Sequence, residues 1–115
     1  MSQVALTLPW PPSVNHYWGQ CGTRRYIKEK GVKFRELTAE QVAAIGKKME
    51  GRLSVFVTLF PPNRQRRDID NSLKALLDAL QHAGCFDDDE QIDVLHIERK
   101  SVTKGGKCCV VVTHA

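Results

Sequence analysis

The chain has 115 residues, of which 42% are hydrophobic and 26% are charged, an ordinary composition for a globular protein. This length is near the common domain size, so we expect a single domain over residues 1–115 whose core needs neither disulfides nor a structural metal. The net charge of +4 is too small to identify a nucleic-acid partner by itself.

The cellular location is indicated by what the sequence lacks. No segment approaches the roughly 20 apolar residues that a membrane-spanning helix needs, and no signal peptide is evident. The cysteines show no zinc-site spacing, and we interpret them as reduced thiols. They are Cys21, Cys85, Cys108 and Cys109. We therefore expect a cytoplasmic protein with no membrane partner.

The N-terminal segment predicts a strand followed by a rigid turn. Residues 4–8 alternate and are rich in strand formers, and the prolines of residues 9–13 end the strand. Residues 14–19 combine an amide, a histidine and aromatic side chains. These side chains form either a binding surface or a cover over one end of the core.

Residues 20–33 form a polar and basic stretch. Its charged residues are Arg24, Arg25, Lys28, Lys30 and Lys33, with Glu29 as the single acid. Such a stretch is either a solvated face or an arm that contacts phosphate groups.

A helix is predicted from about residue 30 to residue 49, because apolar residues recur there at every third or fourth position. These residues are Phe34, Leu37, Val42, Ile45 and Met49. Gly51 fits the position just past the end of this helix.

The segment Leu53–Phe60 predicts a strand with apolar residues on both faces. One face carries Leu53, Val55, Val57 and Leu59. Because Phe56 and Phe60 lie on the other face, we expect a central strand that is covered on both sides.

The next helix has the clearest pattern, with leucines spaced i, i+3, i+4 and i+7. These are Leu73, Leu76, Leu77 and Leu80. Asp70 or Asn71 is expected to cap its N-terminus, and Gly84 to follow its C-terminus. At about 100° per residue, Lys74 lies one turn from both Asp70 and Asp78, so it can reach the same space as Asp70.

The C-terminal part predicts two strands, residues 92–100 and 108–113. Residues 101–107, which include Gly105 and Gly106, have the composition of a hairpin turn between them. The complete pattern predicts an α+β fold, with one mixed sheet of about four to five strands flanked by two main helices. The expected order is strand, helix, strand, helix, strand, strand.

Two groups of carboxylates suggest a chemistry. Asp68 and Asp70 are two apart and can point the same way, and we expect the fold to bring the acidic residues 87–90 to them. Converging carboxylates repel one another unless a cation such as Mg²⁺ or Mn²⁺ lies between them. With Lys74 and the preceding arginines to hold a phosphate, this arrangement predicts metal-dependent phosphodiester hydrolysis.

A purely structural interpretation of the same residues remains open. Asp70 could serve only as a helix cap, and Asp68 could serve only as an ion-pair partner of Arg66 or Arg67. Residues 87–90 could be a solvated acidic turn, and an Asp-x-Asp pair alone is weakly specific.

The acidic pair belongs to a longer, ordered set of motifs. The central set is Arg66, Arg67, Asp68, Ile69, Asp70, Asn71, Lys74, Asp78, Ala79, Leu80, Ala83, Gly84, Asp88, Asp89, Gln91 and Ile92. Residues 8–13 with Asn15 and Tyr17 precede it, and residues 102–106 follow it. This combination resembles the RusA family of Holliday junction resolvases over nearly the whole chain.

The resemblance implies a single RusA-like endonuclease domain, in a homodimer that resolves four-way DNA junctions in recombination and repair with Mg²⁺ or Mn²⁺. By motif position, Asp68, Asp70 and Asp89 match the metal-binding acids, and Lys74 matches an essential lysine. Asp87 extends the acidic pair, which raises the question of whether Asp88 or Asp89 is the ligand. Counting back from Gln91 favours Asp89.

The expected DNA contacts are Arg64, Arg66, Arg67, Lys74, Lys104, Lys107, Asn15 and Tyr17. No nucleotide cofactor is expected, and the resemblance favours a bacterial or phage origin. Two alternatives remain: a catalytically silent protein that binds branched DNA, and a metal-dependent nuclease for other branched DNA.

Overall fold

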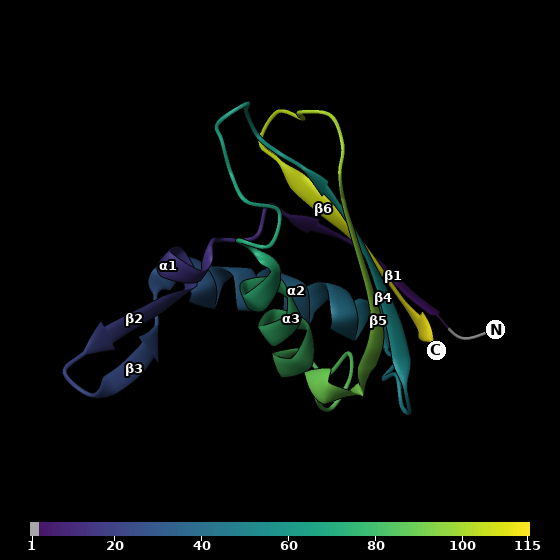
Figure 1. Cartoon of the computed structure of the whole chain (residues 1–115). Coiled ribbons are helices and arrows are strands. Elements are labelled where there is room, and N and C mark those ends of the chain that lie inside the picture. Colours follow the sequence, from purple (N-terminus) through teal and green to yellow (C-terminus); the bar gives the residue numbers. More distant parts are fainter. Residues whose placement is uncertain (1–2) are drawn as a thin grey trace.

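The computed structural model describes residues 3–115 and has an α+β fold, as predicted (Figure 1). Its elements in chain order are β1 (Gln3–Pro9), α1 (Val14–Tyr17), β2 (Trp18–Cys21), β3 (Arg24–Ile27), α2 (Glu29–Ile45), β4 (Leu53–Phe60), α3 (Leu73–His82), the 3₁₀ helix η1 (Asp89–Gln91), β5 (Ile92–Arg99) and β6 (Lys107–His114). Within the described residues, no helix has the length and apolar character needed to cross a membrane.

The main sheet is mixed and has the strand order β1-β6-β4-β5. β6 is antiparallel to both β1 and β4, whereas β5 runs parallel to β4. The predicted hairpin between β5 and β6 is therefore wrong, because β4 lies between these strands. The glycine pair permits close packing instead: a Cβ at Gly106 would lie 2.9 Å from the Trp10 Cβ atom and 3.0 Å from the Pro62 Cδ atom.

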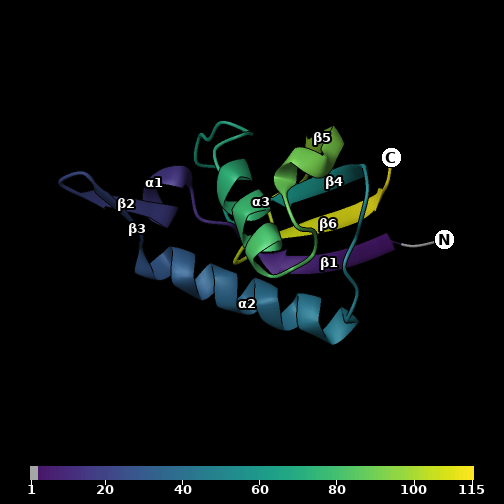
Figure 2. The same cartoon turned by 90° about the horizontal axis from the view of Figure 1, so that it is seen from below.

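β4 occupies the predicted central position, but only one of its faces is covered. Its core face carries the buried Leu53, Val55, Val57 and Leu59. On the opposite face, the Phe56 side chain is 41% exposed. Both long helices pack on the same side of the sheet, as Figures 1 and 2 show, so the expectation of cover on both sides is wrong.

Helix α2 ends four residues earlier than predicted, at Ile45. Gly46 follows with a φ of 68°, and its N–H donates to the Val42 carbonyl over 3.0 Å, which closes the helix. Met49 is still buried, because the chain turns back and the Met49 N–H donates to the Cys85 carbonyl over 2.8 Å. The apolar spacing that predicted the helix thus continues to Met49, although the helix itself ends at Ile45.

A two-stranded hairpin of β2 and β3 was not predicted. It projects away from the main sheet (Figure 1), with Trp18 opposite Ile27 and Gly19 opposite Tyr26. Gly22 forms its turn with a φ of 61°. The two strands have almost no alternating apolar pattern, so most of this segment was identified from the sequence only as polar and basic.

A hydrogen-bonded cluster ties the three helices together. The buried Tyr17 hydroxyl donates to the Asp78 carboxylate, and Arg35 donates from Nε to the Tyr17 hydroxyl over 2.7 Å and from Nη2 to Asp78 over 2.7 Å. Burial and the bond to Asp78 hold the pKa of the Tyr17 hydroxyl well above its usual value, so it remains a donor. The Asp78 carboxylate therefore holds α1 and α2 against α3.

We expect Asp78→Ala to lower the free energy of unfolding by about 1–3 kcal/mol, because it leaves the Tyr17 hydroxyl and Arg35 without their acceptor. Urea unfolding followed by circular dichroism measures the change. Asp87→Ala is the matched control, since it removes only an exposed ion pair with Lys48. Equal effects of the two substitutions would contradict the role of the cluster.

Candidate active site

Asp68 and Asp70 lie in the turn that leads into α3. Their backbone carbonyls accept hydrogen bonds from Asn71 and Leu73, each over 3.1 Å. The helix cap predicted for Asp70 or Asn71 is wrong, because Ser72 occupies the N-cap position and no side chain completes the cap. Within residues 3–115, neither acid forms a salt bridge or a side-chain hydrogen bond. Both carboxylates are exposed and available to a ligand.

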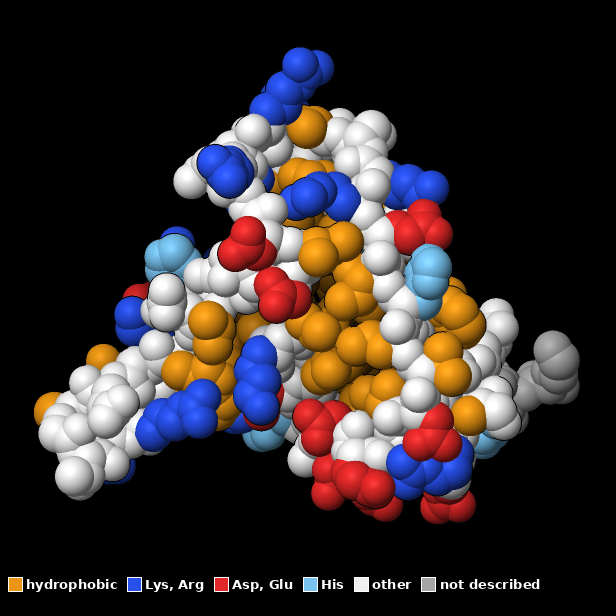
Figure 3. Space-filling view, viewed as in Figure 1, with side chains coloured by type: hydrophobic (Ala, Val, Ile, Leu, Met, Phe, Trp, Pro, Cys, Tyr) orange, Lys and Arg blue, Asp and Glu red, His pale blue; other side chains and the backbone are white. Residues whose placement is uncertain are grey.

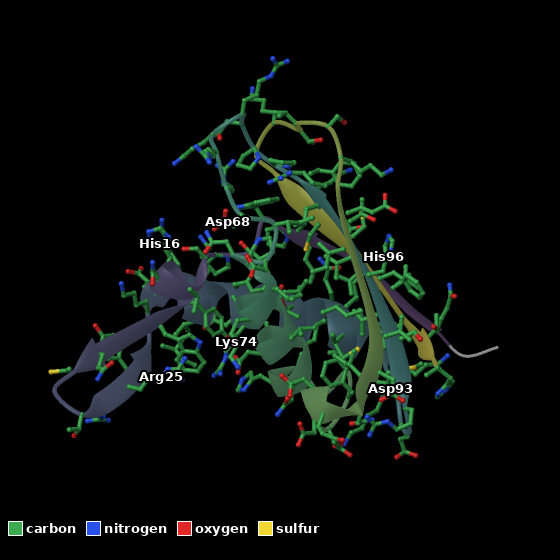
Figure 4. All side chains as sticks on the ribbon, viewed as in Figure 1. His16, Arg25, Asp68, Lys74, Asp93 and His96 are labelled. Atoms are coloured by element: carbon green, nitrogen blue, oxygen red, sulfur yellow. The ribbon has the colours of Figure 1, made fainter. Side chains whose placement is uncertain are left out.

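Lys74 is exposed on the first turn of α3, near the same end of the helix as the acidic pair. Figure 4 shows Lys74 and Asp68 on one side of the molecule. In the described part of the chain, Lys74 has no salt-bridge partner, and Asp78 pairs with Arg35 instead. Its ammonium group is therefore free to approach a phosphate beside Asp68 and Asp70.

The arginine-rich loop, residues 63–67, is held by its own side chains. Arg67 donates from Nη2 to the Asn63 side-chain oxygen over 2.8 Å, and its guanidinium lies 5.6 Å from the ring centre of Trp10. Arg99 donates from Nη1 to the Arg67 carbonyl over 2.8 Å. Arg64 and Arg66 remain exposed, so the loop presents positive charge from a fixed base.

Two clefts flank this loop. One, of about 430 Å³, lies between the loop and the end of β5. The other, of about 520 Å³, lies between the loop and α2. Their cationic linings include Arg64, Arg66, Arg67, Arg99 and Lys100 in the first, and Arg66, Arg67, Lys30 and Lys33 in the second.

Arg99 was missed as a site residue because it lies about 30 positions after the arginine-rich loop in the sequence. The parallel pairing of β4 and β5 places it opposite Leu59, at the end of the sheet from which the arginine-rich loop leaves. Ligands commonly bind at the carboxyl ends of parallel strands, so this pairing is the signal that would have found it.

The remaining predicted DNA contacts differ in accessibility. Lys104 and Asn15 are exposed, whereas Lys107 is half-buried with its ammonium 5.0 Å from the ring centre of Phe60. Tyr17 is fully buried and its hydroxyl is occupied, so a direct DNA contact is contradicted for this residue. We reassign Tyr17 to the core.

The acidic turn, residues 87–90, is held from both sides. The Asp88 carboxylate accepts from the Glu90 N–H over 2.9 Å, and the Gln91 side chain accepts from the Asp87 and Asp88 N–H groups over 3.0 Å. Asp87 pairs with Lys48, and Glu90 pairs with Arg52. Of the four acidic side chains in this turn, only the Asp89 carboxylate has no partner among the described residues, so no internal contact competes for it.

The two acidic groups lie at opposite ends of α3. The Asp89 N–H donates to the Gln81 side chain over 2.9 Å, near the C-terminus of the helix, whereas Asp68 and Asp70 precede its N-terminus. Ten helical residues span about 15 Å. No three metal-ligating residues gather anywhere in residues 3–115. The expected convergence of Asp68, Asp70 and Asp89 within one chain is therefore wrong.

Comparison with known proteins identifies the family. Residues 9–113 match the family model of endodeoxyribonuclease RusA. The chain belongs to the RusA family. It is 37% identical to the crossover junction endodeoxyribonuclease of Enterobacteria phage HK97, and 33% identical to that of Escherichia coli K12. Each match covers 98% of this chain and 96% of the relative. The resemblance inferred from the RusA motifs is thus confirmed.

We expect Asp88→Ala and Asp89→Ala to affect stability differently. Asp88→Ala removes the cap of η1 and should lower the free energy of unfolding by about 1 kcal/mol. Asp89→Ala removes no hydrogen bond of its carboxylate and should leave stability nearly unchanged. Parallel urea unfolding curves measure both effects, and a larger loss for Asp89→Ala would overturn this assignment.

Proposed function

We propose that this protein is a Holliday junction resolvase, which cuts four-way DNA junctions in recombination and repair by metal-dependent hydrolysis. The observation that carries this proposal is an arginine-lined cleft with Asp68 in its lining, while Asp70 and Lys74 are exposed at the start of α3. The printed names of the relatives, crossover junction endodeoxyribonucleases, support a junction as the substrate.

The roles of the side chains follow from their chemistry. Asp68 and Asp70 supply the two carboxylates that Mg²⁺ commonly takes, and Mn²⁺ can substitute. Such an ion would polarise a phosphate oxygen and lower the pKa of a bound water. Lys74 neutralises charge that develops on the phosphate, and Arg64 and Arg66 hold neighbouring phosphates.

We propose further that the active form is a homodimer, in which Asp89 of the partner subunit completes each site. The open flank of α3 toward β5 is apolar, and Ile69, Leu73 and Ile97 line a groove there. Leu95, two residues before Ile97 on β5, is 41% exposed. Figure 3 shows this hydrophobic area with acidic side chains at its upper left and lower edges.

A two-fold axis through that apolar area would pack α3 against its copy in opposite directions. The acidic turn of one subunit would then meet the N-terminal end of α3 in the other, which carries Asp68, Asp70 and Lys74. A cation bound there would offset the repulsion between the converging carboxylates. The dimer would carry two equivalent sites, as two symmetric cuts in a junction require.

We expect wild-type protein with Mg²⁺ to make paired nicks in a synthetic immobile four-way junction and to leave a linear duplex of the same arms uncut. Asp70→Asn should reduce the rate by on the order of 100-fold or more, because a metal ion contributes several kcal/mol to such a reaction. Glu40→Gln is the control, since it removes one exposed carboxylate of α2 far along the chain from the site. Tight junction binding by wild type without cleavage under Mg²⁺ or Mn²⁺ would instead favour a catalytically silent binder.

Heterodimers of Asp70→Asn and Asp89→Asn subunits test the shared site. The heterodimer can be isolated by coexpressing the two variant subunits with different affinity tags. If Asp89 acts across the dimer, the heterodimer keeps one complete site, and it should bind Mn²⁺ by calorimetry and nick one junction strand. Each mutant homodimer should do neither. If all three acids act within one chain, every site of the heterodimer lacks an acid, and Mn²⁺ binding and nicking should both be absent.

A further inference from the structure

The hairpin of β2 and β3 is the most basic part of the molecule without a role in the site. Residues 18–28, which comprise the hairpin and the residue after it, carry three basic side chains and no acid. Among residues 3–115, no salt bridge involves Arg24, Arg25 or Lys28. The hairpin therefore offers unpaired positive charge on a projecting element (Figure 1).

Tyr26 forms a flat, supported surface on this hairpin. It pairs with Gly19 on the neighbouring strand, and a Cβ atom at Gly19 would lie only 2.4 Å from the Tyr26 Cζ atom. The ring thus lies directly against the glycine backbone, which only a residue without a side chain permits. Tyr26 is nevertheless 46% exposed, so part of the ring is available to a ligand.

Trp18 supports the adjacent cation. The Arg25 guanidinium lies 4.0 Å from the Trp18 ring centre, and Trp18 packs edge-on against the buried Tyr17 at 5.1 Å between ring centres. The buried Trp18 Nε1–H has no acceptor within the described part of the chain.

These groups share one groove of about 440 Å³. Its lining is Val14, Asn15, Trp18, Gly19, Gln20, Arg25, Tyr26 and Lys28. A groove that combines cations with an aromatic face matches the physics of single-stranded DNA binding, in which bases stack and phosphates are neutralised. Bases inside a duplex are already stacked on one another and present no free face to Tyr26.

We propose that this groove binds an unpaired DNA strand, with a base stacked on Tyr26 and with phosphates held by Arg25 and Lys28. The hairpin is connected to the site, because the Val14 N–H at the start of α1 donates to the Asn71 carbonyl over 3.1 Å. Arg25 and Lys74 also lie on the same side of the molecule (Figure 4). Only the source of the strand, nucleotides splayed at a junction crossover, rests on the proposed function.

The test measures fluorescence anisotropy with two labelled probes, a twelve-nucleotide thymidine strand and an abasic strand of equal length. Wild type should bind the thymidine strand about tenfold more tightly than the abasic strand, as stacking of one base predicts. Tyr26→Ala should remove this preference and leave affinity for the abasic strand unchanged. Tyr26→Phe should retain the preference, because the ring remains.

Gly19→Ala provides an independent check that keeps the tyrosine. The added methyl group displaces the Tyr26 ring, so this variant should also lose the preference for bases. Val32→Ala, which trims an exposed residue of α2, should behave as wild type. Circular dichroism verifies that each variant is folded.

Equal weakening of both probes by Tyr26→Ala, or no effect on either, would overturn the proposal. Failure of wild type to prefer the thymidine strand would overturn it as well. The binding assay contains no metal and no cleavage step. A protein that cuts no junction but shows the Tyr26-dependent preference would refute only the proposed function, and the converse result would refute only this inference.

Discussion

Parallel pairing of β4 and β5 is the constraint on which the candidate site depends. Because the two strands run in the same direction, their chain exits lie at the same end of the sheet, where the backbone N–H of Lys100 donates to the Leu59 carbonyl over 2.8 Å. The arginine-rich loop leaves β4 there and returns to the start of α3. The cationic cleft and the acidic pair are thus brought together by strand direction.

Local patterns predicted the elements that local physics determines. β1, β4 and α3 were recognised because their apolar periods match the strand and the helix, and the positions of Asp68 and Asp70 before α3 followed directly. The insertion of β6 between β1 and β4 was not predictable in this way, since it depends on competition between distant strands. The separation of Asp89 from Asp70 also depends on an uninterrupted α3 and on Gln81 holding the acidic turn at its far end.

Neighbouring residues on α1 and β2 serve different purposes. Tyr17 fills the core and donates to Asp78, whereas Trp18 supports Arg25 at the surface. Asp78 lies one helical turn after Lys74 on α3. The same helix therefore carries the lysine and, through the bond between Asp78 and Tyr17, holds the segment that leads into the hairpin. A residue of a sequence motif can therefore serve packing: Asp78 belongs to the RusA motif, yet its contacts with Tyr17 and Arg35 are structural.

The pairing of β1 with β6 sets the order in which the molecule can fold. Gln3 lies opposite Thr113, and β6 separates β1 from β4, so β1 has no strand partner until the last part of the chain is available, whereas β4 can pair with β5 earlier. During synthesis, the acidic pair and the arginine-rich loop leave the ribosome well before β6 does. Contacts this distant in sequence form slowly, because the intervening chain must first close into a loop. A nascent chain therefore carries Asp68, Asp70 and the arginine-rich loop before β6 completes the sheet.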